Sequence, residues 1–204
     1  HDALPIFTQT LFMTFWSALF GGLLGLIFGI GLVITAPNGI APNRALFWLF
    51  DKVVSIFRAV PFIILLAAIA PFTKLIVGTQ IGTTAALVPL SLGVFPFYAR
   101  QVQVALAEVD GGIVEAAQAV GASFWDIVFG VYLREGRSEI IRVSTVTLIS
   151  LIGLTAMAGA IGAGGLGNMA ISYGYNRFAS DTTWVATILV LIFVLIVQLV
   201  GDFL

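Results

Sequence analysis

The segment Thr8–Thr35, TQTLFMTFWSALFGGLLGLIFGIGLVIT, contains no charged residue and decides the class of fold. An α-helix needs about 20 apolar residues to cross roughly 30 Å of hydrocarbon, so this segment is long enough to span a bilayer. Gly21, Gly25 and Gly29 recur at every fourth position within it. That spacing places the three glycines on one helical face, where the backbone of a neighbouring helix can approach closely.

Composition extends this conclusion to the whole chain. Of its 204 residues, 60% are apolar and 9% are charged, and the net charge is −1. Soluble proteins average about half apolar and a quarter charged residues. No basic cluster interleaved with aromatic residues supports nucleic-acid binding. The lack of cysteine and the single histidine, His1, argue against a metal site or a histidine-centred catalytic site. We predict one integral membrane domain, residues 1–204, in a lipid bilayer.

Apolar runs predict an all-α integral membrane fold with about five transmembrane helices. The second predicted helix contains only a short apolar run, Ala59–Thr73. The helix is expected to begin earlier, at Val53, and to be kinked at Pro61. The five predicted spans are residues 8–35, 53–73, 75–99, 141–160 and 182–201.

Lysine and arginine residues set the expected orientation. Loops on the cytoplasmic side of a membrane protein carry an excess of these residues. With five spans, one side holds seven of them and the other side holds Lys74 and Arg177. The N-terminus is therefore expected outside and the loop 100–140 in the cytoplasm. The seven are Arg44, Lys52, Arg58, Arg100, Arg134, Arg137 and Arg142.

Ten of the nineteen charged residues gather between Arg100 and Arg142. Within this polar stretch, Gly111-Gly112 is expected to end an extension of the third span. The alanine-rich segment Ile113–Val120 suits a short helix. Gly121 follows it where a left-handed backbone is needed.

A second short helix is expected to begin at Ser123. Asp126, three residues later, completes the pattern of a capping box. From this pattern alone, the two helices could equally be an amphipathic connector lying at the membrane interface.

The amino-acid sequence of the same loop resembles a known motif. Glu115-Ala116-Ala117, then Gly121, Ile127 and Leu133-Arg134-Glu135, is similar to the EAA loop of bacterial ABC importer permeases. In that family the loop forms coupling helices that seat in a groove of the cytoplasmic ATPase. Arg134 replaces a common proline, so the helix is expected to run unbroken into the fourth span. The resemblance implies that the residues coupling to the ATPase are Glu115, Ala116, Ala117, Gly121 and Asp126.

Other segments resemble methionine importer permeases in particular. They include Phe57–Leu66, Val88–Leu90, Gly162–Gly167 and Tyr173–Tyr175, so the resemblance covers nearly the whole chain. It implies a non-enzymatic permease subunit in the bacterial inner membrane. The implied partners are a second copy of the chain, two cytoplasmic ATPase subunits and an extracytoplasmic substrate-binding lipoprotein. ATP and Mg²⁺ would belong to the ATPase, and this chain would bind no cofactor.

Energy supply must come from another polypeptide if transport is active. The chain lacks the GxxxxGK[ST] sequence of a P-loop. The predicted spans also lack Asp and Glu near their midpoints, where an ion-coupled carrier would keep an ionisable group. A channel or secondary carrier without a nucleotide partner is the alternative. An intramembrane enzyme has the least support, because no paired acids or metal-binding motif falls in the spans.

A path for a small zwitterion needs small, mildly polar residues. Such residues gather along the fourth predicted span, although their glycines could serve only helix packing. The run Gly162–Gly167 is expected to form an outer turn or re-entrant segment. Arg58 could reach the headgroups, pair with Glu108 or pair across a dimer, and the sequence leaves these open. The candidate path residues are Pro61, Ser150, Thr155, Met157, Gly159 and Gly162.

Overall fold

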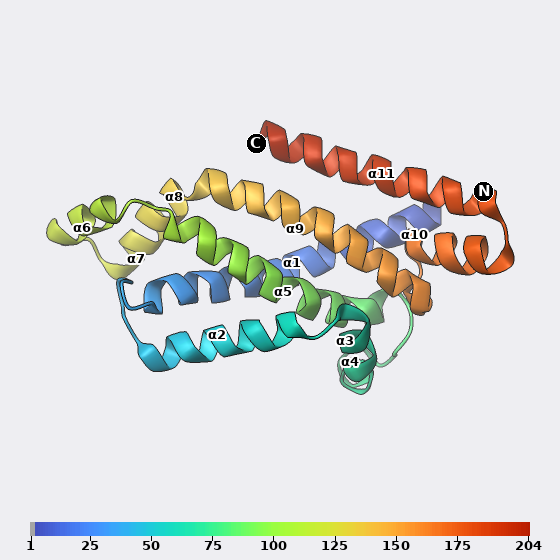
Figure 1. The fold of residues 1–204 in the computed structure, drawn as a ribbon, viewed down its shortest axis with the longest axis horizontal. Helices are drawn as coiled ribbons and strands as arrows, with labels where there is room; N and C mark the ends of the chain where they lie inside the picture. The colour runs from blue at the N-terminus through green and yellow to red at the C-terminus, as the bar shows by residue number, and fades with distance from the viewer. Residues whose placement is uncertain (1–2) are drawn as a thin grey trace.

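The computed structural model describes residues 3–204, which contain helices and no strand; His1 lies outside them. Helix α1 (Ala3–Thr35) packs lengthwise against α5 (Thr83–Ala107), and both run in the same direction (Figure 1). The predicted glycine face is confirmed. A Cβ added at Gly21, Gly25 or Gly29 would lie 2.8 Å from a backbone carbonyl oxygen of α5. Those oxygens belong to Ser91, Phe95 and Ala99, respectively.

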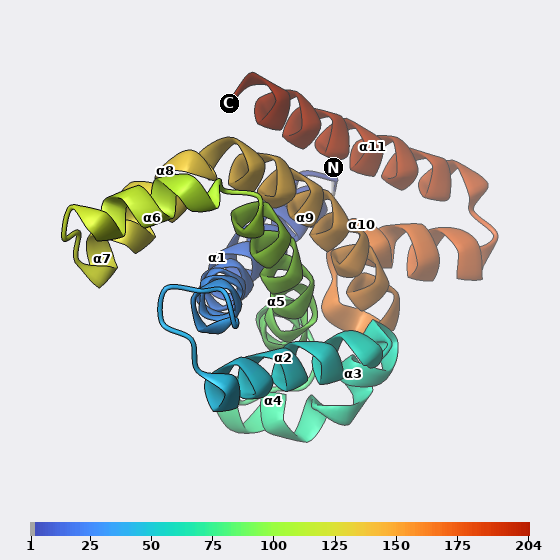
Figure 2. The ribbon, with the colours of Figure 1, turned by 60° about the vertical axis from the view of Figure 1, so that its left-hand side comes forward.

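Helix α9 (Arg137–Ala158) completes the centre of the bundle by packing on α5 and α1. Helix α11 (Ser180–Phe203) runs antiparallel to α9 on the outside. Figure 2 shows α11 on one side of this centre and α2–α4 on the opposite side. Met13, Leu90 and Leu151, one from each central helix, are fully buried together.

The second predicted span is not one kinked helix. It is divided into α2 (Arg44–Ala59), α3 (Phe62–Ala68) and α4 (Ala70–Val77). The break falls at Val60 and Pro61, whose ψ angles of 120° and 135° are extended. Proline lacks an N–H and excludes the helical conformation of the residue before it, so the chain leaves the helix here rather than bending within it.

The third predicted span is displaced along the chain. Leu75–Val77 belong to α4, which ends at Gly78 with φ 84°. Helix α5 begins at Thr83 and continues to Ala107, beyond the predicted end at Ala99. Hydropathy does not place a break here, because Thr79 and Gln80 are uncharged and lie between two long apolar runs.

The polar stretch forms a group of short elements at one end of the bundle. They are α6 (Gly111–Ala119), α7 (Phe124–Ile127), the π-helix η1 (Val128–Tyr132) and α8 (Leu133–Glu135). The glycine pair does not end α5. Asp110 caps α6, its carboxylate accepting from the N–H of Gly112 at 2.8 Å, so the pair forms the first turn of α6.

The predicted unbroken helix into the fourth span is also wrong. Gly136, with φ −80° and ψ 2°, separates α8 from α9. A Cβ at this position would lie 2.7 Å from the Leu106 side chain. The turn at Gly136 therefore coincides with close packing against the end of α5. It forms although Arg134 replaces the proline that is common in EAA loops.

At the opposite end, a glycine-rich turn reverses the chain. The π-helix η2 (Gly159–Ala163) leads into α10 (Gly165–Asn168), followed by the π-helix η3 (Met169–Gly174) and the 3₁₀-helix η4 (Tyr175–Arg177). Gly162, Gly164 and Gly165 all have positive φ angles. The turn brings α10 back against α9, as expected of a re-entrant segment.

Within residues 3–204, three helices are long and apolar enough to cross a membrane. They are Leu4–Thr35, Arg137–Ala163 and Ser180–Phe203. The first, fourth and fifth predicted spans thus correspond to clear candidates. The second and third correspond to the broken α2–α4 segment and to α5, which carries prolines at positions 89 and 96.

Candidate functional site

The turn between α6 and α7 depends on Gly121. Its φ of 80° is left-handed, and the N–H of Ala122 donates to the carbonyl of Ala117 at 3.0 Å. A Cβ on Gly121 would meet nothing within 4 Å. Glycine is therefore favoured here by backbone conformation and not by crowding, as the sequence predicted.

The start of α7 is closed by the predicted capping box. The backbone N–H of Asp126 donates to the Ser123 hydroxyl at 3.3 Å, and that of Ser123 donates to the Asp126 carboxylate at 3.0 Å. The hydrogen bond from the Ser123 hydroxyl is the main cause of a lowered pKa for Asp126. One oxygen of this exposed carboxylate accepts both hydrogen bonds from Ser123, so Asp126 fixes the start of α7.

Helix α6 turns both polar and small side chains outwards, and Ala117 is half-buried against the bundle. Glu115 and Ala116 are exposed, whereas Val114 is buried in a cluster with Leu106 and Tyr132. Glu115 also borders a cavity of about 460 Å³ between α6, the end of α5 and the turn after α1. The exposed face of α6 is thus held firmly to the bundle while remaining open to a partner.

Exposed aromatic residues lie beside this face, and sequence analysis did not select them. Trp125 and Phe129 are 63% and 61% exposed. Their rings stack with centroids 5.9 Å apart, and Phe124 meets Trp125 edge-on at 5.1 Å. The three aromatics within six residues were the available signal, but the capping pattern alone does not say that they face outwards.

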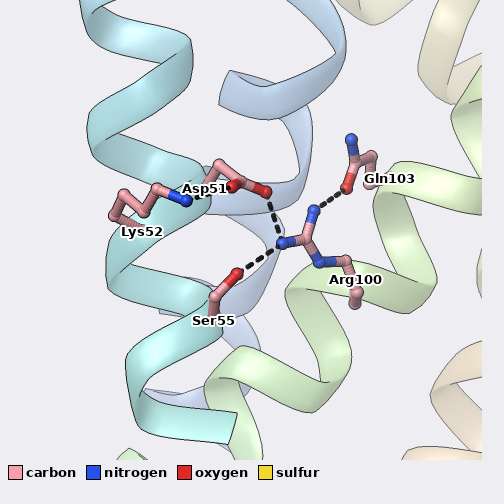
Figure 3. Close-up of polar contacts among 5 residues, drawn as sticks. All are labelled: Asp51, Lys52, Ser55, Arg100 and Gln103. Atoms are coloured by element: carbon pink, nitrogen blue, oxygen red, sulfur yellow. Dashed lines mark hydrogen bonds and ion pairs between the residues drawn. The ribbon is translucent and has the colours of Figure 1, made fainter. Parts of the chain in front are cut away.

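A polar cluster ties α2 to α5 (Figure 3). The guanidinium of Arg100 donates to the Asp51 carboxylate at 2.5 Å, to the Ser55 hydroxyl at 3.0 Å and to the Gln103 side chain at 2.7 Å. Lys52 lies 3.9 Å from the same carboxylate. The sequence places Arg100 and Asp51 on one side of the membrane but gives no sign that they pair.

Beyond this cluster, a cavity of about 330 Å³ opens where α2 ends. It lies between the α2–α3 break, α5 and α9, and its walls are mainly apolar. Its lining includes two polar residues, Arg58 on α2 and Ser150 on α9. Ser150 is a predicted path residue, and Pro61 lies at the break beside the cavity.

The other predicted path residues lie elsewhere. Met157 is exposed on α9. Thr155 is buried and donates to the carbonyl of Ile152 at 2.7 Å. Gly159 is buried where α10 returns, and a Cβ there would lie 2.6 Å from the backbone nitrogen of Asn168. Gly162 borders a separate small cavity near Gly82. A role in the path stays a prediction for all of them.

Metal chemistry has no candidate ligand set in the described part of the chain. Residues 3–204 contain no group of three or more His, Asp or Glu side chains placed to hold a metal ion.

Comparison of sequences relates the chain to transport proteins. Residues 21–204 match the family described as binding-protein-dependent transport system inner membrane component. A probable D-methionine transport system permease protein of Haemophilus influenzae is 45% identical over 194 residues, which cover 95% of this chain and 91% of the relative. The methionine import system permease protein of Bacillus subtilis is 46% identical over 171 residues, 84% of this chain and 77% of that protein.

Comparison of structures agrees with the sequences. A chain from an inward-facing conformation of the MetNI methionine ABC transporter superposes with a TM-score of 0.95 at 43% identity, covering 98% of this chain and 93% of that one. A chain of an amino acid ABC transporter has a TM-score of 0.74 at 19% identity, with the same coverage. The second likeness concerns the fold alone.

Proposed function

Because the chain belongs to the family of binding-protein-dependent transport system inner membrane components, we propose that it is the permease subunit of an ATP-driven methionine importer. The observation that carries this proposal is similarity along almost the entire length, at 45% identity over 95% of the chain to a methionine permease. The protein is a multi-pass component of the bacterial inner membrane and a transport subunit, not an enzyme. A separate subunit hydrolyses ATP and would supply the ATP and Mg²⁺ sites.

The single domain would cross the bilayer five times. Helices α1, α5, α9 and α11 make four crossings, and the broken α2–α4 segment makes the remaining one. The α6–α8 end would face the cytoplasm, with the N-terminus outside. The positive-inside rule supports this orientation, because Lys and Arg are concentrated towards the α6–α8 end while Lys74 and Arg177 lie near the other.

The exposed surface from Glu115 to Gly121 would dock the ATPase. Small side chains allow close approach of a partner surface, and the Glu115 carboxylate can pair with a basic group there. The Asp126 capping box would hold the following turn in shape. Two copies of the ATPase would bind two copies of this chain.

The path would run between those two copies, with a substrate-binding lipoprotein delivering methionine from outside. Ser150, Gly153 and Met157 form an exposed face of α9, at a spacing of three to four residues. A Cβ at Gly153 would meet nothing within 4 Å. A second copy would cover this face and enclose a path, with Ser150 at the cavity beside α2.

Co-purification with the ATPase tests the docking surface. We expect Glu115→Lys to weaken recovery of the ATPase and to lower methionine uptake while the permease remains folded. Asp202→Lys is the control, because Asp202 is an exposed carboxylate on α11, outside the loop 100–140. Equal ATPase recovery with both variants would refute a coupling role for α6.

A further inference from the structure

The position of Arg58 along the bundle follows from contacts with two neighbouring helices. The neighbouring Phe57 ring meets the Phe95 ring edge-on, with centroids 5.4 Å apart. Phe95 is the central residue of α5. On the other side of the α2–α3 break, Phe62 contacts Gly93, where a Cβ would lie 2.8 Å from its ring. The segment containing Arg58 is therefore beside the midpoint of α5.

A second helix gives the same depth. Arg58 and Ser150 line one cavity. Ser150 is the central residue of the candidate span Arg137–Ala163. If α5 and α9 cross the bilayer as proposed above, their midpoints place the cavity about halfway across the hydrocarbon.

Arg58 has no partner within residues 3–204: no hydrogen bond or ion pair there engages its guanidinium. Arg100, on the adjacent helix, is by contrast paired with Asp51. Glu108 is too far away to pair with Arg58, because it lies thirteen residues beyond Phe95 on α5, about 20 Å at 1.5 Å per residue.

Depth also argues against a contact with lipid headgroups. Half of the hydrocarbon thickness is about 15 Å, which exceeds the reach of an arginine side chain. An ionisable residue at this depth is costly and is typically kept where it faces a cavity or a transport path. Arg58 belongs to the lining of such a cavity, and its guanidinium has no anionic partner among residues 3–204.

We propose that the guanidinium of Arg58 binds the α-carboxylate of the amino acid in transit. This inference rests on the proposed importer function. A planar guanidinium can donate two parallel hydrogen bonds to a carboxylate. The Ser150 hydroxyl already donates to the carbonyl of Val146 at 3.0 Å, so its oxygen is free to accept from the α-ammonium group.

The remaining walls suit the side chain of methionine. Phe62, Phe97 and Leu154 line the cavity, and a thioether packs favourably against aromatic rings. In an assembly of two copies, two Arg58 residues would face the path. Their positive charge would disfavour lysine or arginine as cargo, so the site would select an apolar amino acid by charge as well as by shape.

The natural absence of cysteine allows a direct test with a single reporter thiol. We would introduce Leu154→Cys and measure its reaction with an anionic sulfonatoethyl and a cationic trimethylammonioethyl methanethiosulfonate in the purified permease–ATPase complex. With Arg58 present, the anionic reagent should react preferentially. Arg58→Gln should lower the ratio of anionic to cationic rates roughly tenfold, whereas Arg58→Lys should largely keep it.

Ligand protection tests recognition of the carboxylate itself. Methionine should slow the labelling of Leu154→Cys, and methioninol, which lacks the carboxylate, should not. Arg58→Gln should abolish the difference. Arg44→Gln is the matched control, because it removes the same charge from the opposite end of α2 and should change neither measurement.

Two results would overturn the proposal: an unchanged rate ratio in Arg58→Gln, or equal protection by methionine and methioninol. If Leu154→Cys does not assemble, Val60→Cys on another wall of the same cavity serves as the reporter. Methionine uptake by the reporter complex is measured in parallel. Normal uptake with a negative labelling result would reject the Arg58 site alone, whereas absent ATP-dependent uptake would reject the importer function.

Discussion

At the scale of single residues, Arg100 and Asp51 hold the inner part of α2 against α5. Both side chains are mostly buried, at 24% and 27% exposed. Removing the carboxylate with Asp51→Ala would leave a charged guanidinium without its strongest partner. We expect a loss of roughly 1.5–3 kcal/mol in stability, measured by thermal or denaturant unfolding of the purified complex.

Lys52→Gln is the control for this pair. The Lys52 side chain is 50% exposed and 3.9 Å from Asp51, and exposed ion pairs contribute at most about 1 kcal/mol. If both variants destabilise the protein equally, the Asp51 carboxylate does not hold Arg100 in place.

Gly121 supports a second prediction at the residue scale. Substitution by alanine places a side chain in a left-handed conformation, which costs about 1–2 kcal/mol. We expect Gly121→Ala to speed amide hydrogen exchange in residues 117–123 and to weaken ATPase binding. Gly111→Ala, in the first turn of α6 and equally open to solvent, should do neither. Unchanged exchange in Gly121→Ala would show that the turn does not need glycine.

At the scale of elements, the contact between α1 and α5 depends on one face of α1. Gly25 lies against Phe95 and Tyr98, whereas a Cβ at Gly22 would meet nothing within 4 Å. Gly25→Leu would separate the helices, and overpacking of this kind typically costs about 1–3 kcal/mol. We expect a reduced yield of monodisperse protein and a lower unfolding temperature, whereas Gly22→Leu should behave like the parent. Equal behaviour of the two variants would contradict the packing described.

Elements differed in how well sequence predicted them. The C-terminal end of α1 coincides with the predicted one, and both ends of α11 lie within two residues of the predicted ends, whereas α1 begins five residues before the predicted start. The prediction of one kinked helix for the second span was wrong, because hydropathy measures the length of an apolar run and not the direction of the chain within it. Pro61 was recognised as a perturbation, but a kink and a complete break have the same local sequence. The depth of Arg58 follows from that break and could not be predicted.

The π-helices and the break at Gly136 were missed for a related reason. Gly136 turns the chain where it packs against Leu106, a contact between residues thirty positions apart. The capping box at Ser123, in contrast, was confirmed, because every group in it lies within four residues. Local hydrogen bonding could be predicted from sequence, and long-range packing could not.

At the scale of the whole molecule, the chain needs partner subunits to work as a transporter. The α9 face around Ser150 and Met157 is exposed, and so is the outward face of α6. The resemblance to the EAA loop pointed to the outward face of α6 from sequence, because that motif is contiguous. On the α9 face, Ser150 and Met157 were selected from sequence, but the adjoining cavity required the structure, because it joins residues from four helices that no spacing rule connects.

Active import of methionine is the central claim, and uptake into proteoliposomes tests it most directly. Labelled methionine would be offered to vesicles containing the permease and its ATPase, with the binding protein and ATP added or withheld. Accumulation against a gradient is expected only when all components are present, and Glu115→Lys should abolish most of it. Equilibration of methionine across vesicles that contain the permease alone, unaffected by ATP, would contradict the account and identify a channel or secondary carrier.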